Sequence, residues 1–221
     1  NVQALAVAPD GVLWAGGGCG VARLDGALWT PVVTCDSISG SVLAIAFSSP
    51  GVVWIASDFG LYRLAAGALT AYSGRAPTAM TVAPDGTVWL GLSPITGGGL
   101  THFDGSNWTT DTEKFPLEYV AALVVDRDGA LWAGGAPGIA HFDGAAWTTY
   151  TEADGLSLSG ITSMAFSPDG VLWAATPSAL FHFDGAAWHL DAASGDATVH
   201  AFSFAPDGDL WLATSKGAVH F

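Results

Sequence analysis

The stretch SPDGVLWAAT, residues 167–176, recurs in this chain in five further versions. They are APDGVLWAG (8–16), SSPGVVWIA (48–56), APDGTVWLG (83–91), DRDGALWAG (126–134) and APDGDLWLAT (205–214). The units around these stretches begin near residues 1, 42, 78, 120, 161 and 200. A fixed period of about forty residues indicates a repeat architecture.

Each unit predicts four short strands separated by turns. In the fifth unit we expect strands at 161–167, 171–176, 179–183 and 186–191, with turns at PDG (168–170), PS (177–178) and DG (184–185). Glycine reaches positive φ cheaply and aspartate bonds its own backbone, so these residues suit tight turns. The runs between turns are rich in Val, Leu, Phe and Trp and have the length of strands. No 3.6-residue periodicity is present, so we expect no helix.

Four antiparallel strands in about forty residues are the size of one propeller blade. We therefore predict an all-β fold, a single β-propeller domain over 1–221 with six four-stranded antiparallel blades. The expected blades are approximately 1–41, 42–77, 78–119, 120–160, 161–199 and 200–221. The last blade lacks its outer strand, because the sequence ends at GAVHF (217–221), which is a third strand.

Residue columns across the repeats predict how the blades pack. The first strands place a small residue before a large one, as in Ala44 and Ile45, so that the bulky face of one blade can fill the shallow face of the next. A tryptophan recurs in every second strand, which favours packing between blades over sugar binding. We expect the third-strand column, Arg23, Arg63, His102, His141, His182 and His220, to be edge-facing framework residues.

The missing outer strand leaves three interpretations open. The chain is a piece of a longer propeller, or it closes as six blades by packing alone, or the open edge of unit six pairs with another chain. The chain starts at Asn1 and not at a methionine, which we interpret as a mature or trimmed form.

Composition excludes some classes of partner. The formal net charge of −14 repels phosphate backbones, so we expect no nucleic-acid role. No apolar run reaches the roughly 18–20 residues of a bilayer span, so we expect no membrane insertion.

The sequence of the repeats resembles that of a known family. FDGAAWTTYTEADGLSLSGITSMAFSPDGVLWAAT (142–176) is similar to two-component regulator propeller repeats. This resemblance implies an extracytoplasmic sensor module of a bacterial signalling protein, with a ligand at one mouth. The APDG–W wording also resembles virginiamycin B lyase propellers, which implies a metal-dependent enzyme with a histidine and an acid at the mouth. That pair has no residue-by-residue match in this chain.

We expect a site on the face formed by the second-to-third loops and the links between blades, because these segments are irregular while the PDG and FDG turns are uniform. The candidate ligand-binding residues are Phe59, Tyr72, Arg75, Phe115, Tyr119, His200 and Lys216. The candidate ligands for a divalent cation such as Ca²⁺ are Asp58, Glu118 and Asp154. A disulfide between Cys19 and Cys35 is geometrically feasible and would indicate an oxidising compartment; two free thiols are the alternative.

These observations predict a ligand-binding or sensory module rather than an enzyme, located outside the cytoplasm of a bacterium. The expected partner is a small molecule or a glycan, or another protein chain at the open edge of blade six. Two alternatives remain. One is a metal-dependent lyase of the virginiamycin B lyase type, and the other is an interaction scaffold or an engineered or truncated fragment without activity of its own.

Overall fold

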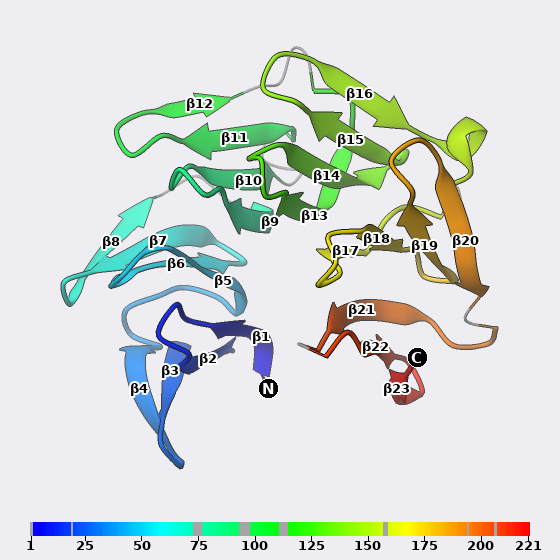
Figure 1. The fold of residues 1–221 in the computed structure, drawn as a ribbon. Helices are drawn as coiled ribbons and strands as arrows, with labels where there is room; N and C mark the ends of the chain where they lie inside the picture. The colour runs from blue at the N-terminus through cyan, green and yellow to red at the C-terminus, as the bar shows by residue number, and fades with distance from the viewer. Residues whose placement is uncertain are drawn as a thin grey trace. The chain divides into compact units, whose positions relative to one another are not determined.

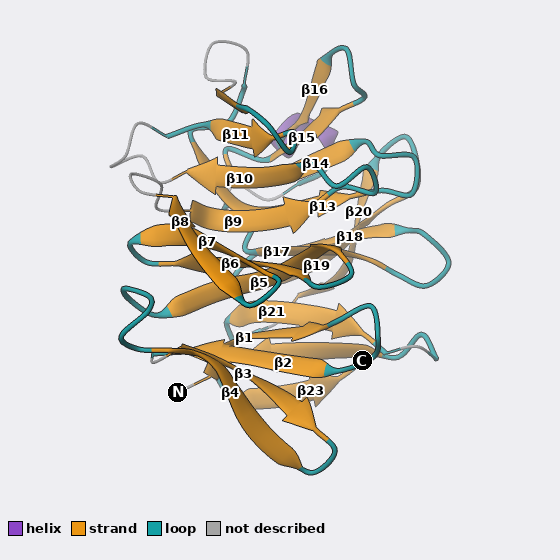
Figure 2. Cartoon of the chain, turned by 90° about the vertical axis from the view of Figure 1, so that its left-hand side faces the viewer, coloured by secondary structure: helices purple, strands orange, loops and turns teal. Residues whose placement is uncertain are grey.

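The structure is a computed structural model that describes residues 2–18, 20–72, 77–92, 98–110, 115–156, 159–193, 195–205 and 207–221. Almost all regular structure in these residues is β-strand (Figure 1; Figure 2). The chain forms two compact units, residues 1–110 and residues 111–221, which are described separately below.

The first unit contains three four-stranded antiparallel sheets, each with its strands in sequence order. Blade 1 is β1 (Val2–Val7), β2 (Leu13–Gly17), β3 (Gly20–Asp25) and β4 (Leu28–Thr34). Blade 2 is β5 (Val42–Ser49), β6 (Val52–Ser57), β7 (Gly60–Ala65) and β8 (Ala68–Tyr72). Blade 3 is β9 (Pro77–Val82), β10 (Val88–Leu92), β11 (Leu100–Phe103) and β12 (Trp108–Thr110).

The second unit contains two further four-stranded sheets and one three-stranded sheet. Blade 4 is β13 (Tyr119–Val125), β14 (Leu131–Ala136), β15 (Ile139–Phe142) and β16 (Trp147–Tyr150). Blade 5 is β17 (Ser163–Phe166), β18 (Leu172–Ala175), β19 (Ala179–Phe183) and β20 (Trp188–Ala193). Blade 6 is β21 (Val199–Phe204), β22 (Leu210–Thr214) and β23 (Gly217–His220).

The fold is a six-bladed β-propeller whose last blade has three strands, so the predicted fold class is confirmed. The expectation of no helix has one small exception, the 3₁₀ helix η2 (Glu152–Asp154). It forms because Thr151 and Asp154 make a capping box and Gly155 ends the turn with φ 98°. No helix in the described part of the chain has the length and hydropathy of a membrane span.

The turn aspartates act as predicted in the hairpins between third and fourth strands. The Asp104 carboxylate accepts the backbone N–H groups of Ser106 and Asn107, both at 2.7 Å. Asp143 and Asp184 accept the equivalent pairs of N–H groups in their own hairpins at 2.8 Å. The repeated FDG sequence therefore forms a hydrogen-bonded turn that sets the register of the two outer strands.

The second-strand tryptophans pack between blades, as the repeat pattern predicts. In the first unit Trp54 of blade 2 is 1% exposed and contacts Phe103 and Trp108 of blade 3. In the second unit Trp132 of blade 4 contacts Phe183 of blade 5 at a ring distance of 5.3 Å.

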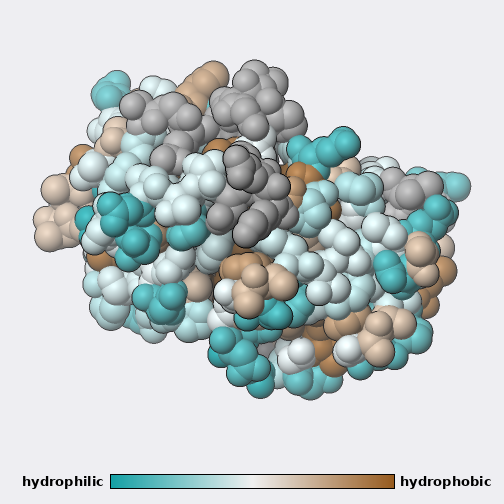
Figure 3. Space-filling view, turned by 90° about the horizontal axis from the view of Figure 1, so that it is seen from above, coloured by the Kyte–Doolittle hydropathy of each residue, from teal (hydrophilic) through white to brown (hydrophobic). Residues whose placement is uncertain are grey.

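On the surface that Figure 3 shows, hydrophilic residues surround small hydrophobic patches.

The third-strand histidines correct one expectation. They do not simply face an edge, because each lies against the tryptophan paired with it in the second strand. The rings of His102 and Trp89 are 4.4 Å apart, and those of His141 and Trp132 are 4.0 Å apart and stacked. The register of the second and third strands places the two side chains directly opposite each other, which produces this contact in blade after blade.

Candidate functional site

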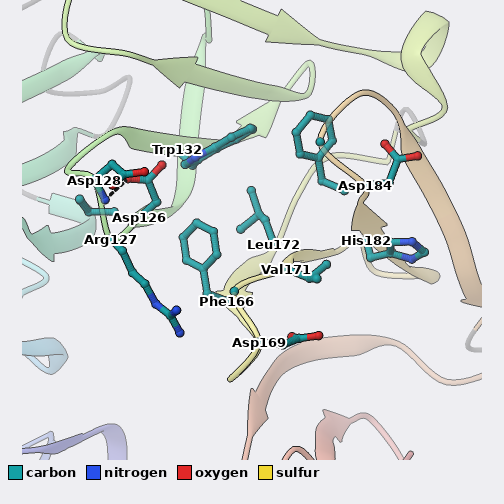
Figure 4. A pocket seen from close by; sticks show the side chains of 14 residues that line it. Asp126, Arg127, Asp128, Trp132, Phe166, Asp169, Val171, Leu172, His182 and Asp184 are labelled. Carbon is teal, nitrogen blue, oxygen red and sulfur yellow. Dashed lines mark hydrogen bonds between the residues drawn. The ribbon is translucent and has the colours of Figure 1, made fainter.

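A groove of about 750 Å³ lies between blades 4 and 5, on the side of the PDG and FDG turns (Figure 4). We call it the blade 4–5 groove. Its lining comprises Val125, Asp126, Arg127, Asp128, Trp132, Phe166, Asp169, Gly170, Val171, Leu172, His182, Phe183, Asp184 and Gly185. Three hairpins supply these residues, namely β13–β14, β17–β18 and β19–β20.

The groove has an apolar floor and a charged rim. In Figure 4 Phe166 and Leu172 point toward Trp132, and the aspartates stand around them. Four carboxylates line the rim: Asp126, Asp128, Asp169 and Asp184. The single lining arginine, Arg127, donates from Nη2 to the carbonyl oxygen of Pro168 at 2.9 Å, which ties the turn of blade 4 to that of blade 5.

Hydrogen bonds keep two of these carboxylates ionised. The N–H groups of Ala187 and Ala186, followed by the His189 side chain, hold the pKa of Asp184 well below its usual range. The Ser167 hydroxyl group is the main cause of the lowered pKa of Asp169. Both effects arise because a hydrogen-bond donor stabilises the charged form of a carboxyl group. The rim is therefore negative at neutral pH.

The groove also contains an indole donor without an acceptor. Trp132 is 6% exposed, and its buried Nε1 has no hydrogen-bond partner in the part of the chain that the structure describes. The equivalent Trp54 in blade 2 donates from Nε1 to Ser48 Oγ at 3.1 Å. The residue in the place of Ser48 is Asp126, whose Oδ1 accepts the N–H groups of Asp128 and Ala130 instead. A buried donor left unpaired is costly, so it marks blade 4 as different from blade 2.

A second groove, of about 490 Å³, lies between blades 5 and 6 and is called the blade 5–6 groove. Its lining includes Trp173, His182, Asp191, Phe204 and Asp207. His182 Nδ1 lies 2.5 Å from Asp191 Oδ2, and the two side chains are 31% and 24% exposed.

The histidine beside this pair is bonded in the same way. His189 Nε2 lies 2.7 Å from Asp184 Oδ2, and its ring stacks on that of His182 at 5.2 Å. Blade 5 therefore carries two adjacent histidine–aspartate pairs on β19, β20 and the turn between them.

The predicted cation ligands do not gather in this way. Asp58 Oδ2 accepts the Ser41 N–H at 2.8 Å, and Asp154 Oδ2 accepts the Thr151 N–H at 2.8 Å, so both serve their own loops. Glu118 is exposed. Among the described residues, no group of three or more His, Cys, Asp or Glu side chains could hold a metal ion. The Ca²⁺ hypothesis stays a prediction.

The predicted ligand-binding residues lie apart from both grooves. Tyr72 packs between blades against Trp54 and Phe103, and Phe115 packs against Trp147. The residues on the surface are Phe59 at 73% exposed, Tyr119 at 38%, His200 and Lys216. Arg75 lies outside the described residues. None of the described candidates lines the blade 4–5 groove or the blade 5–6 groove.

Cys35 directly follows β4 of blade 1. Cys35 is disulfide-bonded. Cys19, the only other cysteine of the chain, lies outside the described residues.

Sequence reasoning missed the groove residues because it treated the PDG and FDG turns as uniform. Two departures from the repeat were visible. DRDG (126–129) replaces the common APDG wording with two acids and a base. WHLD (188–191) replaces the WTTY of residues 147–150 and supplies His189 and Asp191. Both departures fall in blades 4 and 5.

Comparison with known proteins gives a fold and no family. No protein-family model matches the sequence, and no curated protein matches it. Among solved structures, the extracellular domain of the putative one component system BT4673 from B. thetaiotaomicron superposes with a TM-score of 0.81 at 16% identity. A catalytically inactive virginiamycin B lyase from Staphylococcus aureus, solved with quinupristin, superposes with a TM-score of 0.80 at 16% identity.

The likeness is one of fold. Both superpositions cover 100% of this chain, and they cover 31% of the first protein and 83% of the second. The chain thus spans less than a third of the BT4673 extracellular domain that it resembles. Both resemblances expected from the repeat wording are present among these structural neighbours.

Proposed function

We propose that the chain is a sensory or ligand-binding propeller module of an extracytoplasmic protein, and that it binds a cationic group in the blade 4–5 groove. The extracellular domains among the structural neighbours support the location and the class of protein. The geometry and charge of the groove support the kind of ligand.

One comparison within the chain carries this proposal. The first unit has an equivalent groove of about 340 Å³ between blades 1 and 2, with Trp14 and Phe47 in the places of Trp132 and Phe166. Asp10 is the one carboxylate in its lining, together with Arg23. The same scaffold recurs between blades 5 and 6, with Trp173 and Phe204 in these places. Four carboxylates line the copy between blades 4 and 5, three line the copy between blades 5 and 6, and one lines the copy between blades 1 and 2.

This combination suits an ammonium or guanidinium group. The face of an aromatic ring attracts a cation within about 6 Å, and the attraction strengthens where water is excluded. In this groove Phe166 is the half-buried ring that a cation could approach, because His141 and Tyr150 stack on Trp132. Carboxylates at the rim add charge-assisted hydrogen bonds. Pockets of several hundred Å³ with an apolar lining and a few polar groups are typical of small-molecule sites.

Calorimetric titration with choline, spermidine and L-arginine amide tests the proposal. We expect at least one cation to bind, and to bind more weakly at high salt because screening reduces charge attraction. The double variant D128N/D169N should weaken binding about tenfold or more, since each lost charge-assisted bond contributes roughly 1 kcal/mol or more.

The matched control is D85N. Asp85 occupies the same turn position in blade 3, where its carboxylate accepts the Thr87 N–H at 2.9 Å, and it lines neither groove. Binding should survive this change. Absence of binding by all three cations, or equal loss in D85N, would contradict the proposal.

A metal-dependent lyase is the second candidate, and one observation favours it. The Asp191 carboxylate bonds to His182 Nδ1, an arrangement that orients an imidazole as a general base through its other nitrogen. Incubation with quinupristin, with and without added divalent cation, followed by chromatography, tests this function. Turnover that is lost in H182A would replace the binding proposal.

A further inference from the structure

The blade 4–5 groove and the blade 5–6 groove lie on the two sides of blade 5 and share part of their lining. Asp169, Val171 and His182 line both of them. These residues come from the turn between β17 and β18 and from β19. In Figure 4 they lie together on one side of the blade 4–5 groove. We call them the blade 5 ridge, because they separate one groove from the other.

The two grooves have the same construction. Successive residues of a strand point to opposite faces of the sheet, so Leu172 lines the blade 4–5 groove and Trp173 lines the blade 5–6 groove. Phe166 in the first strand of blade 5 and Phe204 in the first strand of blade 6 take the same place in their grooves, and both are half-buried. The two grooves therefore suit the same kind of chemical group.

Both grooves are acidic. Four carboxylates line the blade 4–5 groove and three line the blade 5–6 groove, and Asp169 belongs to both, so six carboxylates face the two grooves. Among the described residues that line them, Arg127 is the one lysine or arginine. The excess of negative charge therefore continues from one groove across the ridge into the other.

The chain already places one cation against the ridge. The Arg127 side chain extends from blade 4, and its Nη2 donates to the carbonyl oxygen of Pro168 at 2.9 Å. The Ser167 hydroxyl group is the main cause of the lowered pKa of Asp169, and the charge of Arg127 adds to it. The guanidinium group thus shows that the turn between β17 and β18 accepts hydrogen bonds from a cationic group.

We propose that a linear aliphatic diamine or polyamine binds across the blade 5 ridge, with one ammonium group in each groove. This inference rests on the cation site proposed above and adds an equivalent site beside it. In this arrangement the methylene chain lies over Val171. Asp128 and Asp184 attract one ammonium group, and Asp191 and Asp207 attract the other.

The length of the ligand follows from the thickness of one blade. Packed sheets lie about 10 Å apart, so equivalent points in the grooves on the two sides of blade 5 are separated by about the same distance. An eight-carbon diamine covers this distance and the four-carbon diamine putrescine does not. Two linked groups gain affinity only when the chain between them reaches both sites.

Calorimetric titration with three amines tests the second charge and the length. They are α,ω-diaminooctane, putrescine and n-octylamine, which has the carbon chain of diaminooctane but a single ammonium group. We expect diaminooctane to bind about tenfold or more tightly than either of the others, because its second ammonium group binds within the same complex. High salt should reduce this advantage.

Variants of the chain locate the second ammonium group. D191N/D207N removes two charges from the blade 5–6 groove and should lower the affinity for diaminooctane to that of n-octylamine. The matched control is D85N/D209N, which removes two charges from exposed turn residues that line neither groove. The advantage of diaminooctane should survive in the control. Circular dichroism confirms that each variant is folded.

Titration with choline separates this inference from the proposed function. Binding of choline or n-octylamine without any advantage for diaminooctane over n-octylamine or putrescine would overturn the ridge proposal and leave the single cation site standing. Absence of binding by every amine would overturn both. An advantage that persists in D191N/D207N would also contradict the ridge proposal, because the second ammonium group would then lie outside the blade 5–6 groove.

Discussion

Replacing Gly134 with alanine should destabilise the second unit through the contact between blades 4 and 5. Gly134 lies on β14, and an added Cβ would be 2.6 Å from Ile161 Cγ2 and 2.9 Å from Met164 Sδ. Ile161 and Met164 are both buried. The backbone of Gly134 is not in the left-handed region, so the cost of this change comes from space alone.

The magnitude follows from the distances. Ordinary contacts of a Cβ begin at 3.4 Å, so the methyl group must be accommodated by a shift of roughly 0.8 Å. Overpacking of this kind in a close-packed interior costs about 1–3 kcal/mol of unfolding free energy. For a domain of this size the melting temperature should fall by roughly 3–10 °C.

Urea unfolding of G134A, followed by tryptophan fluorescence, measures this cost. The control is G18A, since a Cβ on Gly18 meets no atom within 4 Å, and we expect no loss of stability there. The double variant G134A/I161A should cost less than the sum of its single variants, because removing the Ile161 side chain frees the space. Equal stabilities of G134A and G18A would refute the argument that blades 4 and 5 meet through this glycine.

Two further predictions concern hydrogen bonds. S48A should lower the unfolding free energy by about 1–3 kcal/mol, because it leaves the buried Nε1 of Trp54 without an acceptor. S49A, at an exposed position, is the control and should change the unfolding free energy little. Urea unfolding of both variants measures the difference. Backbone N–H groups lower the pKa values of Asp143 and Asp184, so their stabilising contribution is complete above about pH 4 and is lost as the pH falls through the folded values. The double variant D143N/D184N should therefore lose less stability than the unchanged chain between about pH 4 and pH 2 in a thermal melt, and an identical decline in both proteins would contradict this.

The fold was predictable because each blade repeats similar turn and strand sequences. A PDG turn, a tryptophan strand and an FDG turn each determine a few residues of structure, and they occur in the same order in unit after unit. The packing of Trp54 and Trp132 between blades followed from the same repetition. A tryptophan present in every repeat is expected to make a contact that every repeat has, and each blade packs against a neighbouring blade.

The grooves were not predictable by that reasoning, because turn residues have two roles in this chain. Asp184 holds a hairpin through two N–H groups and also lines the blade 4–5 groove. Its structural role is visible in the sequence, whereas its second role depends on which side chains of the neighbouring blade lie opposite. Tyr72 shows the converse, as an aromatic residue expected at a ligand site packs between blades 2 and 3.

In a repeat protein, the positions most informative about function are those where one repeat differs in sequence from the others and the difference changes a contact. Asp126 occupies the place of Ser48 and leaves the buried Trp132 without the acceptor that Trp54 has. Asp191 aligns with Tyr150 in sequence, but a register shift in β20 puts Ala192 opposite Leu180, and Asp191 bonds to His182. Each change brings a different local hydrogen bond, since Asp126 accepts the N–H groups of Asp128 and Ala130 and Asp191 bonds to His182. Both aspartates line grooves that contain further carboxylates, so a departure from the repeat changes the charge of a groove as well as the bonding within its blade.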